Sequence, residues 1–121
     1  MPTLTSPEIG RVGEDIAAHH YRSTGHRILA RNVSYPVGEI DLIAETRDGT
    51  VVFVEVKTRS TAAFGGIEAV SCRKVSRMRR AAALWLSDHP APAVRFDAVL
   101  ILPRGDNWGI ECWEDFDGGT R

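Results

Sequence analysis

Two aliphatic runs separated by a short polar turn constrain the fold of this 121-residue chain more than any other feature. The runs are Ile40–Glu45 and Val51–Lys57, and most of their positions are aliphatic. Strands of this composition are buried on both faces, so the sheet that holds them needs a layer of structure on either side. The pattern predicts an antiparallel hairpin at the centre of a layered fold.

The alternation of side chains along a strand predicts which residues share a face. One face carries no charge and consists of Ile40, Leu42, Ala44, Val52, Val54 and Val56. The opposite face consists of Asp41, Ile43, Glu45, Val51, Phe53, Glu55 and Lys57. Asp41 begins the outgoing strand, whereas Glu55 and Lys57 end the returning strand. In an antiparallel hairpin these three charged side chains are therefore expected at the same end.

The length of the turn decides whether Asp41 and Glu55 meet. An even-numbered loop would place them on opposite faces, whereas an odd-numbered loop keeps them on one face. The tripeptide Arg47-Asp48-Gly49 suits a three-residue loop in which the glycine adopts the left-handed conformation. We therefore expect Asp41 to lie opposite Glu55.

Two carboxylates that lie opposite each other repel, so this pair needs a cation. A divalent ion bound through oxygen ligands meets that need, and Lys57 on the same face could contact a phosphate beside the ion. In the alternative interpretation, Lys57 only neutralises the two acids within a structural ion network. The spacing of the residues leaves both interpretations open.

Helix signals flank this central hairpin on both sides in the sequence. Ser6-Pro7-Glu8 is typical of a helix start and Gly25 of a helix end, which predicts the first helix between them. A second helix is expected to begin with Ser71 as its cap and to continue to about His89, before Pro90.

Three further strands are predicted at His26–Val33, Val94–Leu102 and Trp108–Trp113. The first of these is expected at an edge of the sheet, because arginines flank its short apolar positions. Asp97 is interpreted as a hydrogen-bonding residue at a strand end. Residues Ser60–Ile67, which contain two adjacent glycines, are expected to form a loop beside the site.

The net charge of −1 hides a basic region that precedes an acidic end of the chain. Cations near a helix N-terminus oppose the helix dipole, so helix stability does not explain the basic first half of the second helix. An anionic partner would explain it, and a solvated basic face is the alternative. The candidate nucleic-acid-binding residues are Arg59, Arg73, Lys74, Arg77, Arg79 and Arg80.

Composition and length predict a single domain over residues 1–121, since 43% of the residues are hydrophobic and 26% are charged. Within it we expect the N-terminal helix at 6–25, the sheet and basic helix at 26–113, and a flexible tail at 114–121. The two cysteines, Cys72 and Cys112, form no disulfide framework. No signal peptide is recognisable, and the longest aliphatic run is too short to span a membrane. We expect a cytoplasmic protein with free thiols and no membrane contact.

Elements in this order predict an α/β fold with three layers, α/β/α, around a central mixed five-stranded sheet. The pattern Asp41…Glu55-Val56-Lys57 on its central strands resembles the PD-(D/E)xK nuclease superfamily, whose restriction-endonuclease-like fold is akin to that of archaeal Holliday junction resolvases. More closely, the chain resembles the bacterial YraN-like family of inferred endonucleases. The resemblance covers about Glu8–Trp113 and rests on GEDIAA, RILARN, GEIDLIA, VFVEVKTR, RRAAALWL and RFDAVLI.

The resemblance implies metal-binding acids at Asp41 and Glu55, a catalytic lysine at Lys57, and a third metal-binding acid on the first helix at Glu14. The sequence geometry alone instead favours Glu14 as a solvated acid at the edge of that helix. The implied cofactor is Mg²⁺ or Mn²⁺, and the implied reaction is hydrolysis of phosphodiester bonds in DNA, branched or otherwise structured DNA included. Ile40 stands where the superfamily pattern has proline, a departure that leaves both carboxylates in place.

Two other functions stay open. The chain could be a nucleic-acid-binding module that keeps a nuclease scaffold without catalysis, or a structural partner protein that binds no nucleic acid. Retention of all three motif residues favours the endonuclease, and metal-dependent cleavage would separate it from the binding module. The expected partner is nucleic acid, DNA above all, and a homodimer also stays open.

Overall fold

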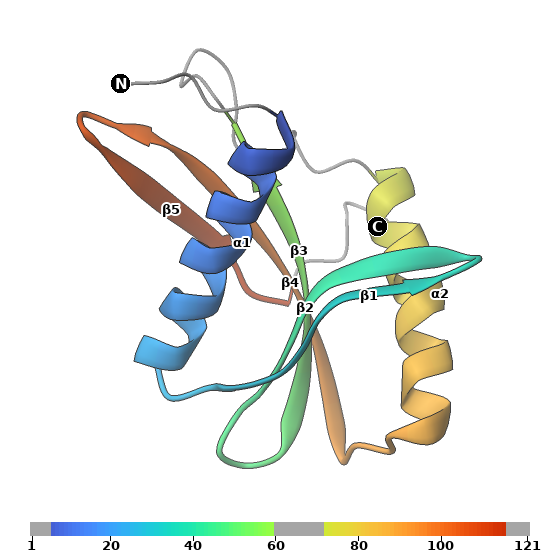
Figure 1. Cartoon of the computed structure of the whole chain (residues 1–121). Coiled ribbons are helices and arrows are strands. Elements are labelled where there is room, and N and C mark those ends of the chain that lie inside the picture. The colour runs from blue at the N-terminus through green and yellow to red at the C-terminus, as the bar shows by residue number, and fades with distance from the viewer. Residues whose placement is uncertain (1–5, 60–71, 116–121) are drawn as a thin grey trace.

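The computed structural model describes residues 6–59 and 72–115, which form two helices and five strands (Figure 1). The elements are α1 (Ser6–Ser23), β1 (Arg27–Tyr35), β2 (Gly38–Glu45), β3 (Thr50–Thr58), α2 (Cys72–Asp88), β4 (Ala93–Arg104) and β5 (Asn107–Trp113). The predicted cap Ser71, the predicted loop Ser60–Ile67 and positions 116–121 of the predicted tail lie outside the described residues.

The five strands form one mixed sheet in the order β1-β2-β3-β4-β5. Neighbouring strands are antiparallel except for β3 and β4, which are parallel and are joined through the segment that contains α2. The central strand β3 is therefore buried between two neighbours, as its aliphatic sequence predicts. The structure confirms the predicted fold class, and β1 is an edge strand as expected.

The helix α1 covers one face of the sheet and α2 covers the other (Figure 1). The buried cluster on the α1 face consists of Ala17, Ala18, Tyr21, Leu42, Ala44, Val52, Val54, Val56, Val99 and Ile101. The cluster on the α2 face consists of Ile40, Ile43, Val51, Phe53, Met78, Ala81, Ala82 and Trp85. These two clusters complete the three layers. None of the helices within 6–59 and 72–115 is long and apolar enough to cross a membrane.

Ile40 corrects the predicted assignment of faces, because it packs on the α2 face and not with Leu42 on the α1 face. Leu42 is the last residue of β2 that pairs with β3, so Ile40 lies beyond the regular ladder between these two strands. The pairing of β1 with β2 stays regular from Arg31↔Leu42 to Val33↔Ile40, and its register shift lies between Ile28 and Ala30. The strict alternation of side chains along β2 therefore does not extend from Leu42 to Ile40.

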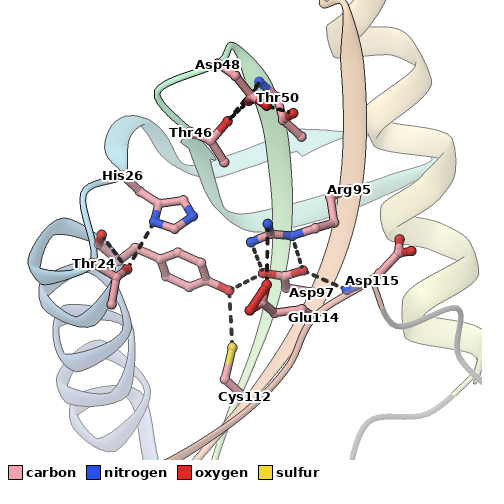
Figure 2. A network of polar contacts seen from close by, with 11 residues as sticks. Thr24, His26, Thr46, Asp48, Thr50, Arg95, Asp97, Cys112, Glu114 and Asp115 are labelled. Atoms are coloured by element: carbon pink, nitrogen blue, oxygen red, sulfur yellow. Dashed lines mark hydrogen bonds and ion pairs between the residues drawn. The ribbon is translucent and has the colours of Figure 1, made fainter.

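The turn between β2 and β3 has the predicted three-residue form. The Thr46 amide donates to the Thr50 carbonyl over 2.9 Å, and Gly49 has a φ of 91°. The Asp48 carboxylate accepts hydrogen bonds from the Thr46 hydroxyl, the Thr50 amide and the Thr50 hydroxyl (Figure 2). This odd-numbered loop sets the register on which the position of Asp41 depends.

Gly25 ends α1 as predicted, with a φ of 89°. The amide of Gly25 donates to the Arg22 carbonyl over 3.1 Å, and the amide of His26 donates to the Tyr21 carbonyl over 3.0 Å. These two bonds form a Schellman motif, which satisfies carbonyl groups at the end of the helix. The strand β1 continues to Tyr35, two residues beyond its predicted end.

Asp97 lies inside β4 and not at a strand end, and it joins three parts of the chain (Figure 2). Its side chain is 1% exposed and accepts hydrogen bonds from the Tyr21 hydroxyl at 2.7 Å and the Asp115 amide at 3.0 Å. The Arg95 guanidinium donates to both carboxylate oxygens at 2.9 Å. Arg95 also pairs with Glu114, so Glu114 and Asp115, which belong to the predicted tail, are tethered to β4.

Replacing Asp97 by asparagine should lower the free energy of unfolding by about 2–4 kcal/mol, because it removes the buried charge that pairs with the half-buried Arg95. Urea denaturation at pH 7 measures this difference. The control is Asp15→Asn, which removes an exposed ion pair with Arg31 and should cost less than about 1 kcal/mol. Equal losses in the two variants would contradict the structural role given to Asp97.

Candidate active site

The candidate site lies at the end of the β2–β3 hairpin that is remote from its turn. Backbone pairing between the two strands runs from Glu45↔Val51 to Leu42↔Val54, so Asp41 lies directly beyond the last paired residue. Beyond this point the Val56 amide donates to Asp41 Oδ2 over 2.8 Å. The carboxylate of Asp41 therefore accepts a hydrogen bond from the backbone of the neighbouring strand at the end of the ladder, where the two acids lie close together.

The two carboxylates share a cavity of about 70 Å³ lined by Gly38, Glu39, Asp41, Glu55, Lys74 and Arg77. Glu55 is only 4% exposed, although it is charged. Its Oε2 lies 3.3 Å from Lys74 Nζ, which comes from the first turns of α2. The structure thus brings Asp41 and Glu55 together as predicted, and it adds Lys74 as an ion-pair partner of Glu55.

The pKa values of the charged groups in this cavity reflect burial and the closeness of the two acids. Burial and then repulsion by Glu55 raise the pKa of Asp41 from 3.8 to about 7, although the Val56 amide and Lys74 act in the opposite direction. Burial alone would lower the pKa of Lys74, but attraction to Glu55 and Asp41 raises it. Two oxygen-rich groups in a small polar cavity, one of them held close to neutrality, fit a divalent cation.

Lys57 and Glu14 lie in an adjoining cavity of about 340 Å³, whose lining consists of Ile9, Gly10, Glu14, Val56, Lys57, Thr58 and Lys74. Lys57 therefore lies beside the carboxylate pair and does not line its cavity. Lys74 borders both cavities. The expected group of three charged side chains is divided between two neighbouring cavities.

Glu14 is half-buried and faces this site, which corrects the interpretation of a solvated acid at a helix edge. Burial raises its pKa, a hydrogen bond with Asn32 opposes that shift, and the charge of Asp41 adds to it. Within 6–59 and 72–115, no three His, Cys, Asp or Glu side chains lie close enough together to hold a metal ion. An ion on Asp41 and Glu55 would complete its coordination with water or phosphate oxygens, as Mg²⁺ usually does.

The predicted basic residues divide into two groups. Arg73, Lys74, Arg77 and Arg80 are exposed on α2, and Arg77 lines the carboxylate cavity. The guanidinium of Arg79 instead lies 4.6 Å from the ring centroid of Phe96, in a cation–π contact with the sheet. Arg59 is half-buried at the end of β3, and its amide donates to the Ile101 carbonyl over 2.8 Å. The exposed row on α2 is the better candidate for phosphate contacts.

Two glycines bring the helices to this site. A Cβ atom on Gly13 would lie 1.8 Å from Thr58 Oγ1, so α1 rests directly on the end of β3 beside Glu14. A Cβ atom on Gly38 would lie 2.3 Å from the Arg77 carbonyl oxygen, so β2 rests directly on α2. Since real Cβ contacts are much longer, only glycine permits these approaches.

The sequence interpretation missed Glu39 and the ion pair between Lys74 and Glu55. Glu39 precedes the motif acid by two positions, and its exposed side chain lines the same cavity. The sequence held a weak signal for this ion pair, because α2 follows β3 in the chain and carries several cations in its first turns. The distance between Lys74 and Glu55 depends on the docking of α2, which no local pattern encodes.

Comparisons with known proteins establish the family. The model of the uncharacterised protein family UPF0102 matches residues 13–101. A UPF0102 protein of Corynebacterium efficiens is 47% identical over 116 residues, which are 94% of this chain and 95% of that protein. A UPF0102 protein of Mycolicibacterium smegmatis is 48% identical over 105 residues, 84% of this chain and 85% of the relative. The chain therefore belongs to the UPF0102 family, which confirms the predicted YraN-like family.

Among solved structures, the chain is similar to one from the structure of an EndoMS–dsDNA2 complex, with a TM-score of 0.49 and 17% identity. The aligned region covers 79% of this chain and 36% of the other, so the protein spans about a third of that chain's length.

Replacing Asp41 by asparagine should raise the free energy of unfolding relative to the parent, and this gain should be larger at pH 8 than at pH 5. The pKa of Asp41 is raised in the folded state, so its contribution to stability is fully present below pH 3.8 and is lost as the pH rises through 7. Asparagine removes this loss, and the gain relative to the parent between pH 5 and pH 8 should be about 1–2 kcal/mol after solvent screening. Urea denaturation in a chelating buffer at each pH measures it, with Asp15→Asn as the control. A gain that shrinks towards pH 8 would contradict the electrostatic picture.

Proposed function

We propose that this member of the UPF0102 family is an endonuclease that depends on Mg²⁺ or Mn²⁺ and hydrolyses phosphodiester bonds in DNA, branched or otherwise structured DNA included. The observation that carries the proposal is the pairing of Asp41 with Glu55 in one small polar cavity. Burying two acids together is costly, and the repulsion that raises the pKa of Asp41 is relieved by a bound cation. DNA and these ions meet in the cytoplasm, where we place the protein.

Asp41 and Glu55 would hold the divalent ion, and Glu14 from α1 would support it through water. When bound, the ion would polarise a phosphodiester and lower the pKa of a coordinated water. The two carboxylates supply hard oxygen ligands, which suit Mg²⁺ and Mn²⁺ better than softer metals.

The side chains of the adjoining cavity would handle the substrate. Lys57 and Lys74 line this cavity, and their ammonium groups would stabilise the negative charge that develops on a scissile phosphate there. Glu14 in the same cavity can accept a hydrogen bond from a water molecule and so orient it. Arg73 and Arg77, exposed on α2, would contact backbone phosphates and set the position of the strand without reading its sequence.

A second candidate function is a nucleic-acid-binding module without catalysis. The ion pair between Lys74 and Glu55 favours it, because this pair already supplies part of the positive charge that the acids need. In that case the constellation would be an ion network that stabilises one arrangement of the hairpin and α2. The two candidates differ in whether DNA is cleaved when metal is present.

A cleavage assay on supercoiled, linear and four-way-junction DNA, with Mg²⁺, Mn²⁺ or chelator, separates these candidates. The parent should cleave at least one substrate only with metal, and Glu55→Gln should abolish cleavage. Lys57→Met should keep metal binding and slow single-turnover cleavage by roughly 10²–10³, since the lysine would act by electrostatic stabilisation. Calorimetric titration measures the metal affinity of each variant.

The control for Lys57→Met is Arg47→Met, which removes an exposed cation in the turn at the opposite end of the hairpin and should leave cleavage unchanged. Binding of all three DNA forms without cleavage in either metal would favour the binding module. A rate for Arg47→Met as low as that for Lys57→Met would indicate a general loss of charge attraction.

Replacing Arg77 by methionine should weaken DNA binding in a salt-dependent way. Each phosphate contact releases counterions, so the slope of log affinity against log salt should fall by about 0.9 in magnitude. Arg79→Met is the matched control on the same helix, because its guanidinium lies over Phe96 and its loss should leave the slope unchanged. Fluorescence anisotropy with a labelled duplex in chelator, at several salt concentrations, measures both slopes. Equal slopes for the parent and Arg77→Met would contradict phosphate binding by the exposed cations of α2 and would favour the alternative of a solvated basic face.

A further inference from the structure

Lys74 is the described cation that connects the carboxylate pair to the rest of the site. Its Nζ lies 3.3 Å from Glu55 Oε2, and its charge also acts on Asp41. The two side chains differ in their surroundings, because Glu55 is buried whereas the Lys74 side chain is 53% exposed. A half-exposed ammonium that leaves its partner is readily hydrated, so its release costs little free energy. The buried carboxylate of Glu55 stays where the strand holds it.

Lys74 also borders the second cavity, together with Lys57, Thr58 and Glu14. Its stem has four flexible methylene groups, so the same residue can direct its ammonium to either cavity. In the structure described here the ammonium lies at the carboxylate side. The carboxylates come from β2 and β3, whereas Lys74 comes from α2, so the ion pair also holds the helix to the sheet at this end.

We propose that Lys74 is the resident counter-ion of the carboxylate pair and competes with a divalent ion for Glu55. Binding of the ion would then release the Lys74 ammonium towards the second cavity, where it can contact a phosphate of the substrate. This inference rests on the proposed function and adds a means by which the same site couples metal binding to nucleic-acid binding.

The physical reason is the limited negative charge of the cavity. A divalent ion shared by Asp41 and Glu55 and an ammonium at hydrogen-bond distance from Glu55 would repel each other strongly in a partly buried place. The ion would bind both carboxylates, and the released ammonium could pair with a phosphate when one is present. Metal and nucleic acid therefore favour each other's binding, and this coupling is reciprocal.

The test is calorimetric titration of Mn²⁺ into metal-free protein without nucleic acid. Lys74→Met removes the competing ammonium and should bind Mn²⁺ roughly five-fold more tightly than the parent, the scale of one partly exposed ion pair. Lys57→Met is the matched control, because it removes the other lysine near the site but not the ion pair with Glu55. Its affinity for Mn²⁺ should stay within about two-fold of the parent's.

Lys74→Gln provides a second variant, which keeps a hydrogen-bond donor for the buried Glu55 if the methionine variant unfolds. Tighter Mn²⁺ binding in a folded Lys74 variant, with no such gain in Lys57→Met, supports the proposal. Unchanged or weaker binding in both Lys74 variants overturns it and leaves the endonuclease intact. An equal gain in Lys57→Met also overturns it, since a general charge effect would then explain the result. If the parent itself binds no Mn²⁺ and cleaves no DNA, the proposed function fails together with this inference.

Discussion

The hydrogen bond from the Val56 amide to the Asp41 carboxylate is the interaction on which the geometry of the site depends. It lies beyond Leu42↔Val54, the last backbone pair between β2 and β3, where Asp41 and Glu55 line one cavity. A backbone amide in a sheet must find an acceptor, and here the acceptor is a side chain that also faces a second acid. The end of the hairpin therefore has a fixed geometry and carries negative charge, and α2 supplies Lys74 as a counter-ion.

The two helices reach this point because glycine lies under each of them. Gly13 lets α1 rest on Thr58 at the end of β3, which sets Glu14 beside the second cavity. Gly38 lets β2 rest on the backbone of α2 at Arg77, one turn beyond Lys74. The separation between acids and cations is thus set by close backbone packing and not by the length of the side chains alone. A side chain at either glycine would push a helix, and its charged groups, away from the carboxylate pair.

Much of the fold could be predicted from the sequence, because its signals are local. The hairpin register followed from the odd turn Arg47-Asp48-Gly49, and the layers followed from strands that are apolar on both faces. The face of Ile40 could not be predicted, since the pairing between β2 and β3 ends at Leu42 and the turn does not show where this ladder stops. The partner of Glu55 could not be predicted either, because the docking of α2 on the sheet decides which lysine reaches it.

The contrast between Asp97 and Asp41 distinguishes a structural acid from a candidate functional one. Both lie in the central part of the sheet, but Asp97 receives hydrogen bonds from the Tyr21 hydroxyl, the Arg95 guanidinium and the Asp115 amide. Donors of this kind satisfy a buried carboxylate and stabilise the fold. Asp41 receives the Val56 amide and faces another carboxylate, so its pKa rises and its charge is costly. The fold gives Asp97 several donors, whereas it places Asp41 beside a second carboxylate. The pair of Asp41 and Glu55 is therefore the place where a bound cation contributes most.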